Sequence, residues 1–122
     1  MKDLIILLLF VSAVSCTSKD SGKVQRIDIE TVKADVIGKD VQWVDVRTPQ
    51  EYEAGHIDDA INIDISDSQN FKEKVEKLNK NEPVYIYCQK GGRSERAATL
   101  LKDMGFESIF DYSGGYGEWS QQ

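Results

Sequence analysis

The 122-residue sequence has few of the side chains that bind metals or form disulfides: one histidine and two cysteines. The single histidine, His56, has no second histidine and no cysteine near it, so the sequence predicts no metal site. Basic residues are also scarce, with 15 Lys and Arg against 21 Asp and Glu, a net charge of −6. This balance argues against a nucleic-acid partner and against a polybasic membrane-binding surface. Any binding of anions must therefore depend on a local cluster of positive groups.

Apart from residues 1–15, MKDLIILLLFVSAVS, the sequence has no long hydrophobic run. Lys2 precedes the apolar run and small residues follow it, a pattern typical of a secretory signal and too short for an ordinary membrane span. The run ends in AVSC, which resembles the bacterial lipoprotein signal, in which the cysteine, here Cys16, is lipidated. Residues 16–23 are small and polar and are expected to be a tether. There are two alternatives to lipidation: an ordinary cleavage site in a soluble secreted protein, or an uncleaved anchor.

This interpretation predicts an exported protein, periplasmic or at the cell surface, that contacts a membrane only through its lipid. If Cys16 is lipidated, Cys88 is the single remaining thiol and cannot form an internal disulfide. The compartment would permit a disulfide, so an unpaired thiol there suggests a use for its reactivity.

Residues 24–122 are expected to form one domain in which strands and helices alternate. Such alternation predicts an α/β fold with a mainly parallel central sheet and helices on both faces. Thr48, Pro49 and Glu51 form a capping-box pattern at the start of one helix, which Gly55 closes. The expected strands span 41–46, 60–65, 84–88 and 108–112, and the other helices start at 29, 68 and about 94.

Cys88 ends the apolar strand VYIYC and is followed by three cationic side chains, Lys90, Arg93 and Arg96. In a parallel α/β fold the ligand site lies beyond the carboxyl ends of the strands, which is where Cys88 is expected. Positive charge stabilises the thiolate, the nucleophilic form of cysteine. The alternative is that Cys88 is only a small buried hydrophobic residue.

Two glycines and the start of a helix complete this loop. Gly91 and Gly92 allow a tight turn in which successive amides can face one anion. The helix expected from Ser94 adds unpaired N–H groups and the positive end of its dipole. The loop is therefore predicted to hold a sulfur anion on Cys88.

Three motifs in this order resemble the rhodanese family, the single-domain sulfurtransferases, over about residues 24–119. They are CQKGGR from Cys88, VDVRTPQEYEAGHIDDAINI over residues 44–63, and GGYGEW over residues 114–119. One departure is Asp58-Asp59, which stands where the family usually has Pro-Gly after Gly-His-Ile. That change falls in a turn and should not alter the chemistry.

The resemblance implies a rhodanese-like fold and a Cys88 persulfide that carries sulfur from a donor such as thiosulfate to cyanide or a thiol. It implies no metal or organic cofactor. His56 is expected to be structural. The substrate-binding residues that it implies are Gln89, Lys90, Gly91, Gly92, Arg93 and Ser94. Asp45 and Arg47, at the end of a central strand, are expected to form a structural ion pair or to position the loop.

Other functions remain open at this point. A sulfur carrier or interaction module could hold the persulfide without turnover, and thiol redox chemistry would need a partner thiol. A cysteine phosphatase is disfavoured because that group has five residues between Cys and Arg, whereas four separate Cys88 from Arg93. The physiological donor and acceptor and the oligomeric state are not predicted.

Overall fold

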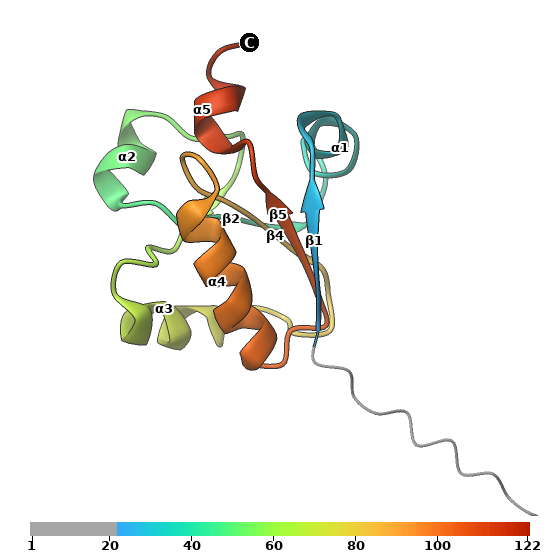
Figure 1. The fold of residues 1–122 in the computed structure, drawn as a ribbon, viewed down its shortest axis with the longest axis vertical. Helices are drawn as coiled ribbons and strands as arrows, with labels where there is room; N and C mark the ends of the chain where they lie inside the picture. The colour runs from blue at the N-terminus through green and yellow to red at the C-terminus, as the bar shows by residue number, and fades with distance from the viewer. Residues whose placement is uncertain (1–21) are drawn as a thin grey trace, which may run out of the picture.

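The computed structural model describes residues 22–122, which form a five-stranded parallel sheet in the order β1-β5-β4-β2-β3 (Figure 1). Each connection between parallel strands has to cross a face of the sheet, and here β5 and β4 lie between β1 and β2. All four strand pairs are parallel, so the carboxyl ends of the strands share one edge. The strands are β1 (Lys23–Ile27), β2 (Gln42–Asp45), β3 (Ile61–Asn62), β4 (Val84–Tyr87) and β5 (Ser108–Tyr112).

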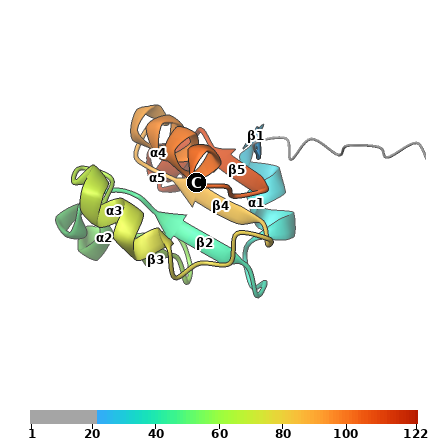
Figure 2. The same ribbon diagram turned by 90° about the horizontal axis from the view of Figure 1, so that it is seen from below.

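Helices cover both faces of the sheet, which confirms the predicted fold class (Figure 2). α3 (Ser68–Val75) and α4 (Gly92–Asp103) pack on one face. On the other face lie α1 (Ile29–Asp35) and the short α5 (Gly115–Trp119). α2 (Pro49–Ala54) follows β2 and has no buried residue.

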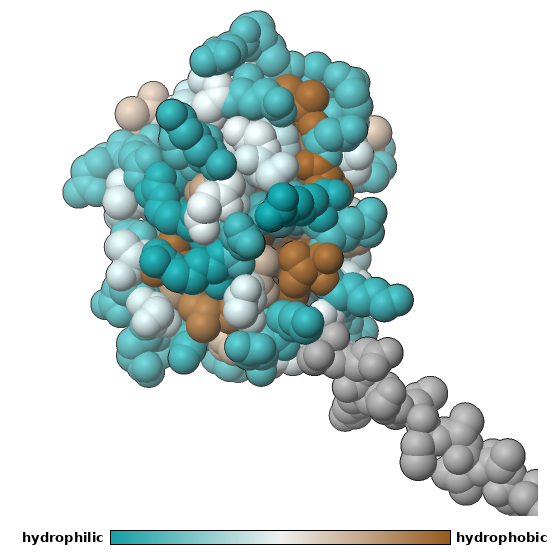
Figure 3. Space-filling model, viewed as in Figure 1, coloured by the Kyte–Doolittle hydropathy of each residue, from teal (hydrophilic) through white to brown (hydrophobic). Residues whose placement is uncertain are grey.

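The side chains of β4 alternate between two hydrophobic clusters. Ile86 and Cys88 point into the cluster beneath α3 and α4, whereas Tyr87 points into the cluster beneath α1 and α5. This period of two is the pleat of a strand buried on both faces. The outer surface over α3 and α4 is mainly hydrophilic, with small apolar patches (Figure 3). Along residues 22–122, none of the helices is long and apolar enough to cross a bilayer.

The capping box of α2 is confirmed. Thr48 Oγ1 accepts from the backbone N–H of Glu51, and the Glu51 carboxylate accepts from the backbone N–H of Thr48. Several predicted boundaries differ from the observed ones. β3 covers only Ile61–Asn62 of residues 60–65, and α4 begins two residues before Ser94.

Two elements were missed. The predicted tether reached residue 23, but Lys23 already belongs to β1, which pairs with β5. Four of its five residues are exposed, so the strand has no hydrophobic alternation. α5 was expected only as a closing motif. The predicted signal sequence, Cys16 and most of the tether lie outside the described residues.

Candidate active site

Cys88 lies one residue beyond the carboxyl end of β4, and its side chain is almost fully buried, with 1% of the residue exposed. The backbone N–H of Gly91 donates to Cys88 Sγ at 3.0 Å. On the other side, Ser94 Oγ lies 3.5 Å from Sγ and accepts from the thiol. Burial therefore accompanies two polar contacts, which a purely hydrophobic cysteine would not require.

The predicted cradle of several amides is smaller than expected. Among the described residues, the Gly91 N–H is the one backbone group that donates to Sγ. Gly91 itself is at φ +98°, and a Cβ there would lie 2.9 Å from the carbonyl oxygen of Ser113. Glycine is thus required both by the left-handed backbone and by the close approach of the following loop.

Arg93, one of the predicted substrate-binding residues, is paired with Glu51 of α2. Its Nη1 and Nη2 donate to the two carboxylate oxygens of Glu51 at 2.6 and 2.9 Å. The hydrogen bond from Arg93 lowers the pKa of Glu51 to about 2, against an opposing effect of burial.

Of the other predicted cations, Lys90 and Arg96 are exposed. Gly92, also a predicted site residue, is exposed at the start of α4.

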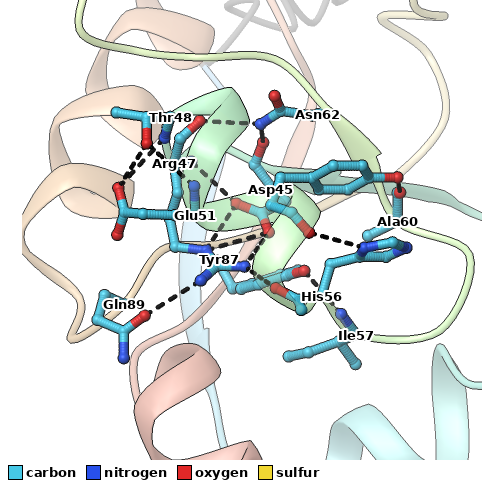
Figure 4. Close-up of polar contacts among 12 residues, drawn as sticks. Asp45, Arg47, Thr48, Glu51, His56, Ile57, Ala60, Asn62, Tyr87 and Gln89 are labelled. Atoms are coloured by element: carbon cyan, nitrogen blue, oxygen red, sulfur yellow. Dashed lines mark hydrogen bonds and ion pairs between the residues drawn. The ribbon is translucent and has the colours of Figure 1, made fainter.

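Arg47 and Asp45 form a buried ion pair at the end of β2 (Figure 4). Arg47 Nη2 lies 2.7 Å from Asp45 Oδ2 and also donates to the carbonyl of Gly55 at 2.6 Å. Arg47 Nη1 donates to Gln89 Oε1 at 3.2 Å, which connects the pair to the cysteine loop. Both predicted roles, structural pairing and loop positioning, are thus present in one network.

Arg47 keeps its charge in this environment. Burial alone would lower the pKa of its guanidinium, but the hydrogen bond and charge of Asp45 outweigh burial and raise it. Tyr87 contributes from β4. Its hydroxyl accepts from the backbone N–H of Ile57 at 2.9 Å, and burial raises its pKa.

α5 holds the cysteine loop from the opposite side. The backbone N–H groups of Tyr116 and Gly117 donate to the carbonyls of Cys88 and Gln89 at 2.9 and 3.0 Å. The guanidinium of Arg47 lies 4.4 Å from the centre of the Tyr116 ring, a cation–π contact. These two hydrogen bonds from α5 to the carbonyls of the loop hold the loop backbone in place.

His56 has no contact with Cys88. It is exposed, its ring stacks on Tyr52 at 3.9 Å between ring centres, and Nδ1 lies 3.0 Å from the Tyr52 carbonyl. This placement agrees with a structural role in the turn after α2.

Three residues of the site were not singled out from the sequence. Glu51 was recognised only as part of the capping box, and its pairing with Arg93, 42 residues away, leaves no local signal. Tyr116 lies in the GGYGEW motif, which indicated a family likeness but no contact with the loop. Asp111 lies on β5, where the strand pattern gave no reason to expect a buried charge.

Comparison with known proteins agrees with this geometry. Residues 28–122 match the rhodanese-like domain family. The chain belongs to this family. Thiosulfate sulfurtransferase 16 of Arabidopsis thaliana is 34% identical over 100 residues, which cover 75% of this chain and 83% of the plant protein. A crystal structure of a rhodanese-like domain protein from Staphylococcus aureus is 31% identical, with a TM-score of 0.68 over 78% of this chain and 90% of that one.

A further relative carries a different name. The putative sulfur carrier protein YrkF of Bacillus subtilis is 30% identical over 105 residues, or 85% of this chain. The chain spans only 55–60% of the length of this protein and of another Bacillus subtilis relative.

The Glu51–Arg93 pair in this rhodanese-like domain should stabilise it in a pH-dependent way. Because the folded-state pKa of Glu51 is lowered from 4.5 to about 2, its contribution is complete above pH 4.5 and is lost as the pH falls toward 2. Urea unfolding of the wild type and of Glu51→Gln should show a gap in unfolding free energy at pH 7 that narrows at pH 3. Glu53→Gln, an exposed change on the same helix, is the control. A gap that is equal at the two pH values would contradict the assignment.

Gly115→Ala should loosen the cysteine loop. Gly115 is at φ +64°, and a Cβ there would clash with the carbonyl oxygen of Cys88. Gly38→Ala is a matched control, since Gly38 is at φ +72° with no atom within 4 Å of a Cβ. We expect the control to lose about 1 kcal/mol of unfolding free energy from backbone strain, and Gly115→Ala about 1–3 kcal/mol more from the clash. Urea unfolding checks the difference, and equal losses would disprove it.

Proposed function

We propose that this chain is a sulfurtransferase that moves a sulfane sulfur from a donor such as thiosulfate to a thiol or cyanide through a Cys88 persulfide. The single observation that supports this most directly is the contact of the Gly91 N–H with Cys88 Sγ at 3.0 Å. A backbone donor aimed at sulfur stabilises the anion that each half-reaction forms. The relatives named as sulfurtransferases support the same chemistry.

In the first half-reaction the Cys88 thiolate attacks the outer sulfur of thiosulfate. The S–S bond of thiosulfate breaks, and sulfite leaves with the electron pair, so the outer sulfur remains on Cys88 as a persulfide anion. In the second half-reaction an acceptor thiolate or cyanide attacks that outer sulfur, and the Cys88 thiolate is released.

Access to Cys88 is the main requirement of this mechanism. With 1% of the residue exposed, a donor reaches Sγ only if the loop around Gly91 moves away from it. Gln89, Lys90 and Gly92, which adjoin this position, are proposed to line the opened site. The exposed Lys90 would offer a positive group to an anionic donor.

A sulfur carrier is the second candidate, favoured by the burial of Cys88 and by the likeness to a putative sulfur carrier. Such a protein would hold the persulfide and release it only to a protein partner. A phosphatase is less favoured, because the bidentate pairing of Arg93 with Glu51 engages the group that would have to bind phosphate.

Intact-mass measurement tests the central step. Treatment with thiosulfate should add about 32 Da, the mass of one sulfur atom, and Cys88→Ala should abolish the gain. Ser66→Ala, an exposed substitution outside the loop, serves as a control that keeps it. Steady production of thiocyanate from thiosulfate and cyanide would identify an enzyme. A stable persulfide without thiocyanate would favour the carrier, and no mass gain would refute both.

We also propose that the protein is exported and held at a membrane by a lipid on Cys16. The support is the sequence pattern of residues 1–16 alone. In a bacterial host, the full chain should incorporate labelled palmitate and sediment with membranes. Cys16→Ser should lose the label, whereas Cys88→Ser should keep it. Labelling that persists in Cys16→Ser would rule out this anchor.

A further inference from the structure

A cavity of about 620 Å³ lies between α1 and α5, on the face of the sheet opposite to the Cys88 thiol. Its lining residues come from β1, α1, β4, β5 and the segment that carries α5. The two helices stand apart at this end of the sheet (Figure 1). A cavity of this size is large enough to receive a small ligand or the side chains of a partner.

Two aromatic side chains from neighbouring strands line the cavity. Tyr85 of β4 is in register with Phe110 of β5, and Phe110 is in register with Gln25 of β1, so the three form one row across the sheet. The rings of Tyr85 and Phe110 stack with 4.8 Å between their centres and 19° between their planes. Both residues are only half-buried. Accessible aromatic faces of this kind attract cations.

Three exposed carboxylates line the same cavity: Asp28, Asp35 and Glu118. Asp28 Oδ1 accepts from the backbone N–H of Thr31 at 2.9 Å, and Glu118 Oε1 accepts from the Tyr112 hydroxyl at 2.7 Å. These hydrogen bonds orient two of the carboxylates, and each still has a second oxygen with which to bind a cation.

Positive charge is scarce along this face. Arg26 is the one basic residue among the described residues that line the cavity, and its guanidinium lies 3.7 Å from Glu95 of α4, on the opposite face of the sheet. Tyr85 also lines a second cavity of about 370 Å³, whose charged lining residues are Asp40 and Glu82. Together the two cavities make an acidic groove, with carboxylates at Asp28, Asp35, Asp40, Glu82 and Glu118.

We propose that the acidic groove binds a basic segment of a partner protein, with a lysine or arginine side chain lying over Tyr85 and Phe110. The aliphatic part of that side chain packs on the rings, and its charged end meets the surrounding carboxylates. Charge complementarity favours this occupant, because the same carboxylates repel phosphate groups and acidic peptides.

The acidic groove lies next to the segment that holds the cysteine loop. Ser113, Gly114 and Glu118 line the groove. Between them, Tyr116 and Gly117 donate their backbone N–H groups to the carbonyls of Cys88 and Gln89. A bound partner would therefore lie close to the loop, as expected of a protein that supplies or accepts the sulfur. This meaning rests on the proposed function, whereas the binding itself does not.

The test is the fluorescence anisotropy of labelled hexalysine added to the full chain. Asp28→Asn combined with Asp35→Asn should weaken binding about fivefold to tenfold, the effect of two ion pairs, and asparagine still caps α1. The control combines Glu53→Gln and Glu73→Gln, two exposed residues of α2 and α3, and should weaken binding less than about twofold. Tyr85→Leu should weaken it about threefold through loss of the cation–π contact.

Equal losses in the two double variants would overturn the proposal, because they would indicate general attraction to a chain of net charge −6. If the groove variant does not fold, carbodiimide coupling of hexalysine to the wild type should join it to Asp28, Asp35 or Glu118. Coupling mainly at Glu53 and Glu73 would overturn the proposal.

Two other occupants of the acidic groove would also overturn the proposal. A wild-type dimer in sedimentation that the groove variant loses would assign the groove to a second copy. Hexalysine binding that appears only after removal of residues 16–21 would assign it to the chain's own N-terminal segment. No binding measurement here uses a sulfur donor, so a failure of sulfur transfer would appear only in the mass measurement.

Discussion

The arrangement of the site depends on the buried ion pair between Arg47 and Asp45. One guanidinium bonds to Asp45 beside it, to the carbonyl of Gly55 after α2, and to Gln89 in the cysteine loop, and it lies against Tyr116 of α5. Four separate segments of the chain therefore share one cation. A buried pair adds little net stability, but removing one partner leaves an uncompensated buried charge, so the pair favours this arrangement of the loops over others. Lysine could not replace Arg47, because it lacks the planar set of donors.

The electrostatics of the cysteine loop differ from a simple cluster of positive charge. Arg93 is paired with Glu51, and Arg47 with Asp45, so two of the nearby cations are neutralised by carboxylates. The contacts with Sγ come instead from the Gly91 N–H and the Ser94 hydroxyl. The Gly91 N–H donates to Sγ and is a fixed dipole that stabilises an anion there, whereas Ser94 Oγ accepts from the thiol. Because Glu51 engages Arg93, the loop suits the proposed persulfide better than a phosphate group, which would need a free guanidinium.

The sequence was sufficient for features that depend on neighbouring residues. The capping box at Thr48 and Glu51, the strand predicted over residues 84–88 and the helix predicted from about Ser94 are local patterns, and each is present. The strand is one residue shorter than predicted, and the helix begins two residues earlier. β1 escaped prediction because an edge strand with four exposed residues carries no alternation. The Glu51–Arg93 pair and the place of Asp111 depend on which strands become neighbours. The spacing of these residues in the sequence does not indicate the order of the strands in the sheet, in which β5 lies between β1 and β4.

The alternation of side chains along β4 explains how the loop can be both held and reactive. Tyr87 points toward α1 and α5, and Cys88 points toward α3 and α4. The carbonyls of Cys88 and Gln89 are bound by α5 on the first side, whereas the thiol meets Gly91 and Ser94 on the second. Movement of Gly91 away from sulfur therefore need not break the contacts with α5. In the proposed sulfur transfer, the loop would open on one face of the sheet while its backbone stays anchored on the other, so Cys88 would keep its place.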